Sequence, residues 1–336
     1  MNLIKPYQAC DQRYKTKNFY KRCGKSGIKL PKVSLGLWHN FGKNDDLQNQ
    51  KKLIQTAFDN GITHFDLANN YGPPPGSAET NFGKILGDDL SAYRDELILS
   101  TKAGYGMWEG PYGDFGSRKY LIASCDQSLK RMNLDYVDIF YHHRPDPDTP
   151  LEETMSALDH LVKSGKALYI GISNYSETEA LKAIRILEGL GTPCLIHQLR
   201  YNMLDAKPQK DVLPSLFQAG VGSIVYSPLA QGLLSNRYRN AIPKGSRAER
   251  KDSPFLSHHE VETHQSIIHN LTILSEKRGQ TLAQLALAWC LRLESVTSVL
   301  IGVSTTEQIK ENLKACDHTD FTEEELHEIS RICQKD

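Results

Sequence analysis

Short runs of apolar, β-branched residues recur along the chain, and each is followed by a longer segment whose apolar positions have helical spacing. A short apolar run bounded by turn residues is typical of a buried strand, whereas apolar residues at intervals of three and four predict an amphipathic helix. Eight runs meet the strand criterion: Val33–Leu37, His64–Ala68, Leu97–Lys102, Asp138–His143, Ala167–Ser173, Leu195–Tyr201, Gly222–Ser227 and Ser298–Gly302.

Amphipathic segments fill the intervals, among them Leu47–Asn60, Ser117–Met132, Leu151–Lys163 and Val212–Ala219. Ser117 can accept a hydrogen bond from the first turn of a helix that starts at Arg118, which is the usual role of an N-cap serine. Gly220 directly follows its segment and is the residue type that most readily ends a helix.

Strand and helix alternate eight times, which predicts a closed (β/α)8 barrel, here one domain over residues 1–336. The alternative is an open, doubly wound sheet. That fold usually carries a Gly-x-Gly-x-x-Gly turn after its first strand, and no such turn is present. The closed barrel is therefore favoured.

Two segments fall outside the repeat. Phe19–Pro31 reads as a hairpin with the turn Gly24–Gly27, and we expect it to plug the N-terminal mouth of the barrel. Leu233–His259 follows the seventh strand and is long, charged and rich in Arg, Ser and His. Loops of this length inside compact domains are usually functional or disordered, and this one follows a strand on the face where barrel enzymes carry their sites.

Composition narrows the function classes. The 336 residues include 40 basic and 40 acidic side chains, so the formal net charge is zero, which argues against a nucleic-acid or membrane-surface protein. No apolar run approaches the roughly 18 residues of a membrane-spanning helix, and the first residues contain no apolar signal region. Seven scattered cysteines without a CxxC pair are typical of reduced thiols, so we expect a cytoplasmic protein.

Candidate chemistry gathers where consecutive strands end. The second strand contains Asp66, with Tyr71 in the next turn; the third ends at Lys102 and the fourth at His143. Each alone has an ordinary alternative: a loop acceptor for Asp66, a solvated lysine, a tyrosine packed on a proline turn, or a histidine facing the helices. In a barrel, however, all four side chains would meet at one mouth.

These four groups suit the reduction of a carbonyl. The pKa of a phenol is about 10, and a neighbouring Lys102 ammonium is expected to lower it for Tyr71. Asp66 would hold that lysine charged, while a neutral His143 would hydrogen-bond the substrate carbonyl oxygen. Hydride delivered by a cofactor would create an alkoxide that Tyr71 protonates.

Seven ordered blocks resemble motifs of the aldo-keto reductase superfamily: GITHFDLANNYG, STKAG, DYVDIFYHHRPD, GISNYS, IHQLRYN, YSPLAQGLL and IGVSTTEQIKENL. WHNFG, NNYGPPPGSAE and MWEGPYG are similar to the branch of the potassium-channel beta subunits, and within it to bacterial enzymes that reduce L-glyceraldehyde 3-phosphate and methylglyoxal. The resemblance implies the same catalytic set of Asp66, Tyr71, Lys102 and His143. It selects His143 over His142, and strand alternation places those two on opposite faces.

The resemblance also implies bound NADP(H). Ser173, Asn174 and Gln198 would hold the nicotinamide carboxamide, with Tyr226 stacked on its ring. The other positions implied for the cofactor are Trp38, Asp66, Ser227, Leu229, Gln231, Gly232, Arg237, Arg247, Gly302, Ser304, Gln308, Glu311 and Asn312. The two arginines suit a 2′-phosphate and so favour NADP, whereas Gln308 at a position where arginine is common weakens that preference.

On the substrate side we expect Trp38, Tyr105, Met107, Trp108 and Tyr112 to line the mouth beside Tyr71 and His143. The alternative for each of the five lining residues is that it packs a loop against the barrel. Arg144 or Arg118 could receive a substrate phosphate. No histidine pattern such as HExxH indicates a metal site. The resemblance implies a homo-oligomer, tetrameric or larger.

Two other functions stay open. The chain could be a regulatory subunit that binds NADP(H) with little turnover, as the channel beta subunits are, although the resemblance places asparagine in those subunits where this chain has His143. It could also act as a dehydrogenase, because the same groups serve both directions of the reaction.

Overall fold

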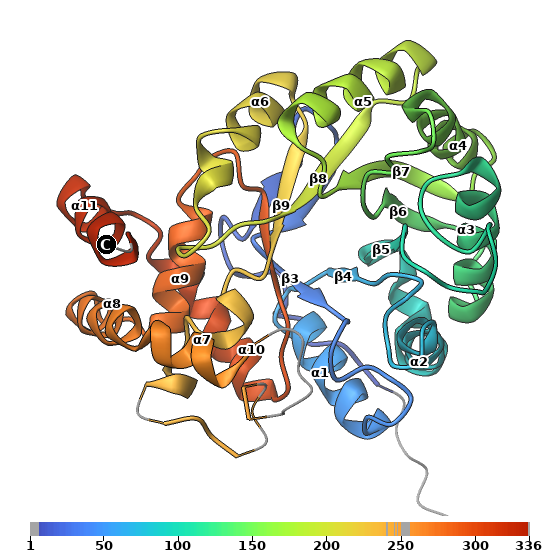
Figure 1. The fold of residues 1–336 in the computed structure, drawn as a ribbon. Coiled ribbons are helices and arrows are strands. Elements are labelled where there is room, and N and C mark those ends of the chain that lie inside the picture. Colours follow the sequence, from blue (N-terminus) through green and yellow to red (C-terminus); the bar gives the residue numbers. More distant parts are fainter. Residues whose placement is uncertain (1–6, 240, 245, 247, 250–255, 335–336) are drawn as a thin grey trace, which may run out of the picture.

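The computed structural model describes residues 7–334 apart from 240, 245, 247 and 250–255. Within these residues, eight parallel strands close into a barrel in the order β10-β3-β4-β5-β6-β7-β8-β9 (Figure 1). The strands are β3 (Val33–Gly36), β4 (His64–Asp66), β5 (Ile98–Ala103), β6 (Val137–His142), β7 (Ala167–Ser173), β8 (Cys194–Arg200), β9 (Gly222–Tyr226) and β10 (Ser298–Ile301). All eight predicted strands and the closed barrel are confirmed; the largest difference is at β4, which ends at Asp66 rather than Ala68.

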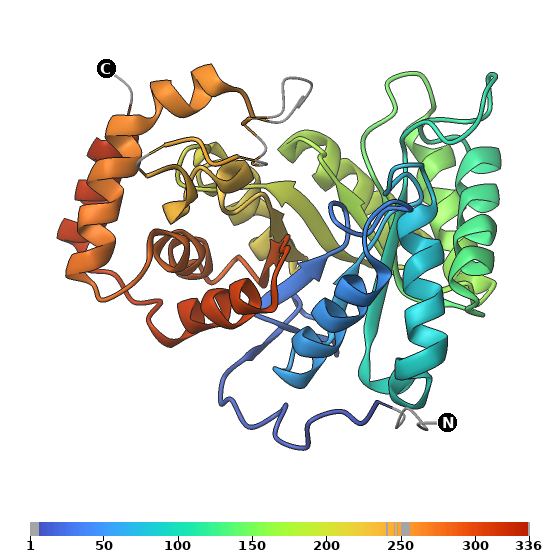
Figure 2. The same ribbon diagram turned by 90° about the horizontal axis from the view of Figure 1, so that it is seen from below.

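Helices surround the barrel, and α8 and α11 lie in an outer layer beyond α9 (Figures 1 and 2). Their bounds are α1 (Leu47–Asp59), α2 (Ser77–Ile85), α3 (Arg118–Met132), α4 (Leu151–Lys163), α5 (Glu177–Leu190), α6 (Val212–Ala219), α7 (His258–Thr263), α8 (Gln265–Lys277), α9 (Leu282–Leu291), α10 (Thr306–Leu313) and α11 (Glu323–Cys333). The predicted helix signals are confirmed, because Ser117 accepts from the Tyr120 N–H and Gly220 ends α6 with a φ of 76°.

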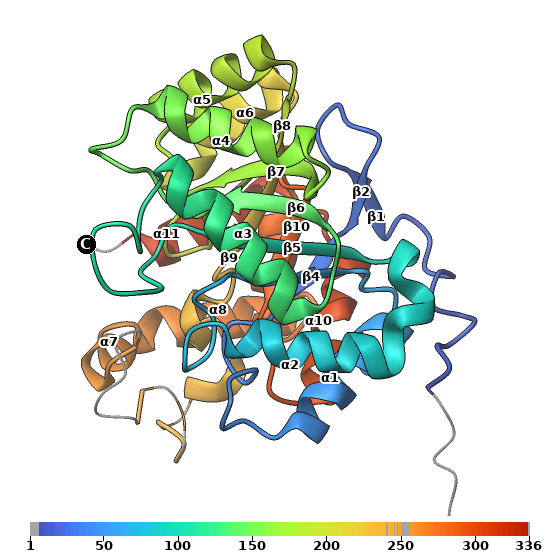
Figure 3. The same ribbon diagram turned by 90° about the vertical axis from the view of Figure 1, so that its right-hand side faces the viewer.

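The N-terminal hairpin closes one end of the barrel, as predicted. Its strands β1 (Tyr20–Arg22) and β2 (Lys29–Pro31) pair antiparallel, and the Lys25 N–H at its turn donates to the Gly220 carbonyl at 2.8 Å. Cys23 and Leu30 pack against residues that face the barrel interior, including Ile139. Figure 3 shows the hairpin and α7 at opposite ends of the barrel, so the other mouth is the one left for a site.

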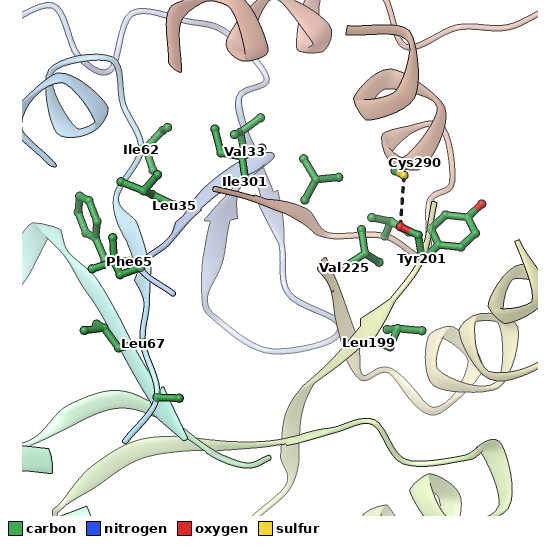
Figure 4. Close-up of a cluster of buried hydrophobic side chains, with 14 of the residues drawn as sticks. Val33, Leu35, Ile62, Phe65, Leu67, Leu199, Tyr201, Val225, Cys290 and Ile301 are labelled. Carbon is green, nitrogen blue, oxygen red and sulfur yellow. Dashed lines mark hydrogen bonds between the residues drawn. The ribbon is translucent and has the colours of Figure 1, made fainter. Parts of the chain in front are cut away.

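Strand alternation separates an apolar outer layer from a partly polar interior. Val33, Leu35 and Phe65 lie in the large core cluster beneath the helices, where the Cys290 thiol of α9 faces the Tyr201 carbonyl (Figure 4). Ser34, between Val33 and Leu35, and His64, directly before Phe65, are buried and hydrogen-bond each other inside the barrel. This alternation brings polar side chains into the interior below the mouth.

The segment after β9 that the sequence predicted to be one long loop contains helical structure. The sequence placed His258 and His259 in a loop, but both lie in α7. Ser257 accepts from the Glu260 N–H and the Glu260 carboxylate accepts from the Ser257 N–H, a reciprocal capping box that starts the helix. A 3-10 turn, Asn236–Tyr238, gives further order to the described part of this segment.

Candidate active site

Four polar side chains meet at the C-terminal mouth of the barrel. Asp66 ends β4, Lys102 is the fifth residue of β5, His143 directly follows β6, and Tyr71 lies in the turn after β4. Asp66 and Lys102 are fully buried, and Tyr71 and His143 are each 8% exposed. The structure therefore brings together the four residues that the sequence placed at consecutive strand ends.

Lys102 is the centre of this group. Its Nζ donates to Asp66 Oδ2 at 2.6 Å, to the Leu67 carbonyl at 2.5 Å and to Tyr71 Oη at 3.2 Å. An ammonium has three N–H groups, so all its donors have partners and the cost of burying the charge is offset. Each acceptor is thereby held at a fixed place around one nitrogen.

Two opposing effects act on this lysine. Burial lowers the pKa of Lys102, and the charge and hydrogen bond of Asp66 oppose that shift. A second carboxylate, Glu79 of α2, acts in the same direction as Asp66. Glu79 is itself buried, accepts a hydrogen bond from Thr101 at 2.5 Å and pairs with Arg131 at 2.7 Å.

The pKa of Tyr71 departs from the sequence-based expectation. Burial raises it well above 10, and the nearby Asp66 charge adds to the rise. The expected net lowering by Lys102 was therefore wrong for the protein alone, because the lysine contact does not outweigh the loss of water around the phenol. Tyr71 is consequently a protonated phenol at neutral pH, the form required of a proton donor.

His143 is held as a neutral imidazole. Burial lowers its pKa well below 6.5, and the positive charges of Lys102 and Arg144 lower it further. Its ring packs edge-on against Tyr71 and Tyr105, with centroid distances of 6.0 and 4.7 Å. Its Nδ1 has no hydrogen-bond partner among the described residues.

The neighbouring His142 faces the other way, as expected from alternation. Its Nδ1 lies at hydrogen-bond distance, 2.6 Å, from the Tyr175 hydroxyl oxygen, and burial lowers the pKa of His142 to about 4. Close to it, an added Cβ on Gly116 of the β5–α3 loop would lie 2.9 Å from the imidazole. His142 thus packs between β6, Tyr175 and that loop.

Aromatic rings cover part of the mouth. Trp38 lies 6.1 Å from Tyr71 in a near-parallel arrangement, and Tyr105 contacts His143, so both border the four-residue group. Trp108 instead packs on Tyr120 at 5.2 Å, which is the loop-packing alternative. Met107 is partly buried beside the core, and Tyr112 is 55% exposed.

The two arginines proposed as phosphate receptors are engaged within the protein. Arg144 donates to both Asp114 carboxylate oxygens at 2.9 and 3.0 Å and to the Gly104 carbonyl at 2.6 Å, with its guanidinium 4.2 Å from the ring centres of both Tyr105 and Phe115. Arg118, the first residue of α3, donates to the Ser156 hydroxyl of α4. Arg144 therefore holds the β5–α3 loop over the mouth.

The residues implied for the nicotinamide end are hydrogen-bonded directly to the four-residue group. Gln198 Nε2 donates to Asp66 Oδ1 at 3.2 Å, and Asn174 Nδ2 donates to the His143 carbonyl at 3.0 Å. The Tyr226 hydroxyl donates to Asn174 Oδ1 at 2.8 Å. The Ser173 hydroxyl is buried without a hydrogen-bond partner among the described residues.

The remaining candidate cofactor residues follow β9 and β10. Ser227 has a positive φ of 52°, and its hydroxyl accepts from Gln231 Nε2 at 3.1 Å, while Leu229 and Gly232 lie in the same tight turn. Gln308 accepts from the Ser304 N–H at 2.8 Å and shares α10 with Glu311 and Asn312, and Gly302 is exposed before it. Arg237 is exposed, and Arg247 lies outside the described residues.

Sequence reasoning missed the residues directly below the site. Ser100 donates to Asp66 Oδ1 at 2.6 Å, and His64 contacts Ser100 at 3.0 Å. Both precede a catalytic candidate by two residues and so share its face of the strand. A polar residue two positions before a catalytic candidate in a barrel strand was the sequence pattern that could have predicted them. Gly104 was also missed: a Cβ there would lie 2.8 Å from His143 Cβ.

Comparison with known proteins gives consistent matches. A family model described as the aldo/keto reductase family matches residues 32–334. The chain is 54% identical to the L-glyceraldehyde 3-phosphate reductase of Escherichia coli K12 over 316 residues, which is 93% of this chain and 91% of the relative. It is 37% identical to a probable voltage-gated potassium channel subunit beta of Arabidopsis thaliana over 89% of this chain and 91% of that one. Among solved structures, a thermostable aldo-keto reductase in complex with the inhibitor epalrestat matches with a TM-score of 0.73 and 29% identity, covering 93% of this chain and 99% of the other.

Proposed function

The chain belongs to the aldo/keto reductase family and is an oxidoreductase, and on this basis we propose that it reduces small aldehydes to alcohols with NADPH as hydride donor. The observation that carries the proposal is the position of Lys102, which donates to Asp66 and Tyr71 beside a neutral His143. L-glyceraldehyde 3-phosphate is the first proposed substrate because the 54% identical relative bears its name, and methylglyoxal is the second.

Tyr71 is the proposed proton donor. Hydride addition to a carbonyl carbon leaves charge on the oxygen, and a phenol within reach neutralises it by giving up its proton. The phenolate that remains accepts from Lys102 Nζ, which lies 3.2 Å from Tyr71 Oη in this structure. The raised pKa of Tyr71 keeps the proton in place until an alkoxide, a much stronger base, takes it.

His143 is the proposed orienting group. A neutral imidazole can donate one N–H to the carbonyl oxygen without competing with Tyr71 as an acid. Edge contacts with Tyr71 and Tyr105 restrict the ring, and the backbone of His143 is fixed at both ends by Ala103 and Asn174. The carbonyl oxygen would then sit between the imidazole and the phenol.

The residues at the ends of β7 and β8 fit a nicotinamide carboxamide. A carboxamide needs both donors and acceptors, and Ser173, Asn174 and Gln198 offer a hydroxyl and two amides. The buried Ser173 hydroxyl, which lacks a protein partner among the described residues, is the specific observation behind this fit. When bound, NADPH would supply the hydride.

Selection of NADPH over NADH is proposed to rest on Arg237. Its exposed guanidinium follows the turn after β9 and suits a 2′-phosphate, whereas the Gln308 amide oxygen is engaged by the Ser304 N–H. Arg247 is proposed for the same role from the sequence alone.

The setting of the enzyme is likewise a proposal. We expect residues 1–336 to form one domain that acts in the cytoplasm as a tetramer or larger homo-oligomer, as the family branch implies. Throughout the described part of the chain, no helix is both long and apolar enough to span a bilayer. A regulatory subunit with little turnover is the second candidate, since the Arabidopsis relative bears the name of a channel subunit.

The decisive test measures NADPH and NADH oxidation by wild type and Tyr71→Phe with L-glyceraldehyde 3-phosphate, methylglyoxal and unphosphorylated glyceraldehyde. We expect turnover with NADPH and a loss of about 10²–10⁴-fold in Tyr71→Phe, with NADPH binding retained. Tight NADPH binding without turnover of any aldehyde would favour the regulatory subunit. Full activity of Tyr71→Phe would overturn the proposed mechanism.

A further inference from the structure

A line of buried polar side chains runs through the barrel interior and ends at Asp66. Ser100 Oγ lies 2.6 Å from Asp66 Oδ1, and His64 Nε2 lies 3.0 Å from Ser100 Oγ. On the other side of the imidazole, Nδ1 lies 2.9 Å from Ser34 Oγ, which is 2.7 Å from Ser298 Oγ. All five residues have no solvent exposure.

The donor and acceptor of every hydrogen bond in this line follow from the Asp66 carboxylate at its end. A carboxylate only accepts, so the single hydroxyl hydrogen of Ser100 must point at Asp66. Ser100 then has only an acceptor left for His64, which requires hydrogen on Nε2. A neutral imidazole protonated at Nε2 accepts at Nδ1, so Ser34 donates to His64.

The last hydrogen is fixed in the same way. Because the only hydrogen of the Ser34 hydroxyl points at His64, Ser34 must accept from Ser298. The imidazole is neutral at pH 7, since burial lowers the pKa of His64 to about 4. Every dipole in the line therefore has its positive end toward the Asp66 carboxylate.

We propose that Ser100 and His64 are positioning residues for aldehyde reduction, and that their one-way hydrogen-bond line holds the Asp66 carboxylate in place against Lys102. Without Ser100, the one hydrogen-bond donor left to Asp66 Oδ1 among the described residues would be Gln198, at 3.2 Å. That amide is also a proposed contact of the nicotinamide. The serine thus leaves Gln198 free to serve the cofactor while Asp66 Oδ1 keeps a short hydrogen bond.

Asp66 acts on the reaction through Lys102. The Asp66 charge raises the pKa of Lys102 against the lowering caused by burial, and so keeps the ammonium protonated. The protonated ammonium is the form of Lys102 that stabilises the Tyr71 phenolate. Weakening the hold on Asp66 should therefore make Lys102 lose its proton at a lower pH. The other titratable groups around Asp66 and Lys102 are the same in wild type and in the variants, so they do not account for a difference between the pH profiles. These groups are His143, Tyr71, Tyr105, Tyr141, Tyr226 and Glu79.

This inference rests on the proposed reductase activity, so its kinetic test uses the best aldehyde found above. We expect Ser100→Ala to lower kcat about tenfold and to move the alkaline fall of kcat toward lower pH by about one unit, with little change in KM for NADPH. His64→Leu should act in the same direction. His64→Gln should restore much of the loss, because the amide can accept from Ser34 and donate to Ser100.

The matched control is Ser223 on β9, a buried serine whose hydroxyl has no hydrogen-bond partner in the described part of the chain. Ser223→Ala should keep the wild-type pH profile. If Ser100→Ala and His64→Leu also keep it, or if His64→Gln restores nothing, the line is only structural and the proposal fails.

A measurement that needs no turnover separates this inference from the proposed function. Nitrogen-15 NMR of histidine-labelled protein, with the His64 signal assigned from the His64→Gln spectrum, should show hydrogen on Nε2 and none on Nδ1 at neutral pH. Hydrogen on Nδ1 would overturn the line even in an active reductase. The Nε2 form in a protein that reduces no aldehyde would defeat the proposed function and leave the line standing.

Discussion

The two halves of the barrel mouth are built in different ways. In the catalytic half, formed by the ends of β4, β5 and β6, buried side chains hold one another, with Lys102 donating to Asp66 and Tyr71. In the cofactor half, formed by the ends of β7 to β10, the backbone does more of the shaping. Asn174, Ser227 and Gln231 all have positive φ there, a conformation rare outside glycine and asparagine.

This difference matches two kinds of task. Acid–base chemistry needs groups fixed in position and protonation state, and burial with paired partners achieves both. Recognition of an extended nucleotide needs many weaker contacts along a surface, which turns and exposed side chains provide. Perturbation of the catalytic half should therefore affect stability and kcat, whereas the cofactor half should respond mainly in nucleotide KM.

The largest effect is expected from Lys102→Met. It leaves the Asp66 charge buried without its partner, so the free energy of unfolding should fall by roughly 3–5 kcal/mol and kcat by about 10³-fold. Asp66→Asn combined with Lys102→Met should recover stability but not activity, as measured by urea unfolding and kinetics. Lys207→Met, which removes an exposed pair with Asp211, should cost less than about 1 kcal/mol. An equal loss of unfolding free energy in the two lysine variants would contradict the idea that buried, paired side chains stabilise the catalytic half.

Gly104→Ala should come next, because its added Cβ would lie 2.8 Å from His143 Cβ and 3.1 Å from the His143 backbone nitrogen. Neither atom can move without shifting the imidazole, and we expect kcat to drop by about 10²-fold. Gly189→Ala on α5 is the control, since nothing lies within 4 Å of its added Cβ. Normal kinetics of Gly104→Ala would show that His143 tolerates displacement.

Acid should destabilise the catalytic half first. Burial lowers the pKa of His64 and His142 to about 4, that of His197 to about 3 and that of His143 well below 6.5, and only His197 belongs to the cofactor half. The unfolded chain then binds protons first as pH falls from about 6.5 toward 4, so stability is lost in that window. His64, His142 and His197 should each contribute about 2 kcal/mol of loss at pH 5.

Urea unfolding at pH 7.5 and pH 5 checks this. His142→Gln should show a smaller loss on acidification than wild type, by about 2 kcal/mol, while His160→Gln, at an exposed site on α4, should match wild type. An unchanged loss in His142→Gln would mean that other groups cause the acid sensitivity.

Arg144→Ala tests whether the β5–α3 loop is part of the catalytic half. We expect kcat/KM to fall about tenfold for phosphorylated and unphosphorylated aldehydes alike, because the guanidinium is engaged by Asp114, Tyr105 and Phe115. Asp114→Asn should give a smaller loss of the same kind. A loss confined to L-glyceraldehyde 3-phosphate would instead identify Arg144 as a phosphate receptor.

The smallest effect is expected in the cofactor half. Arg237→Ala should raise the KM for NADPH a few-fold and leave that for NADH unchanged, since an exposed charge contributes little and acts only on the 2′-phosphate. Steady-state kinetics with both nucleotides measures this. An equal change for NADH would remove Arg237 from nucleotide selection.

The sequence by itself determined the barrel and the residues at its mouth. Apolar periodicity is a local property, so β3 to β10 and the cap at Ser117 could be predicted within a residue or two, and Asp66, Lys102 and His143 followed from strand ends. Barrel topology alone is enough to bring such residues to one mouth.

Only the tertiary structure decided how these residues are held. Ser34 meets Ser298 across 264 positions of sequence, and Arg144 meets Asp114 because a loop folds back over the mouth. The direction of the Tyr71 pKa shift likewise depends on how much water the closed barrel removes. Burial and contacts between distant segments arise only when the barrel closes, and no local pattern encodes their strength.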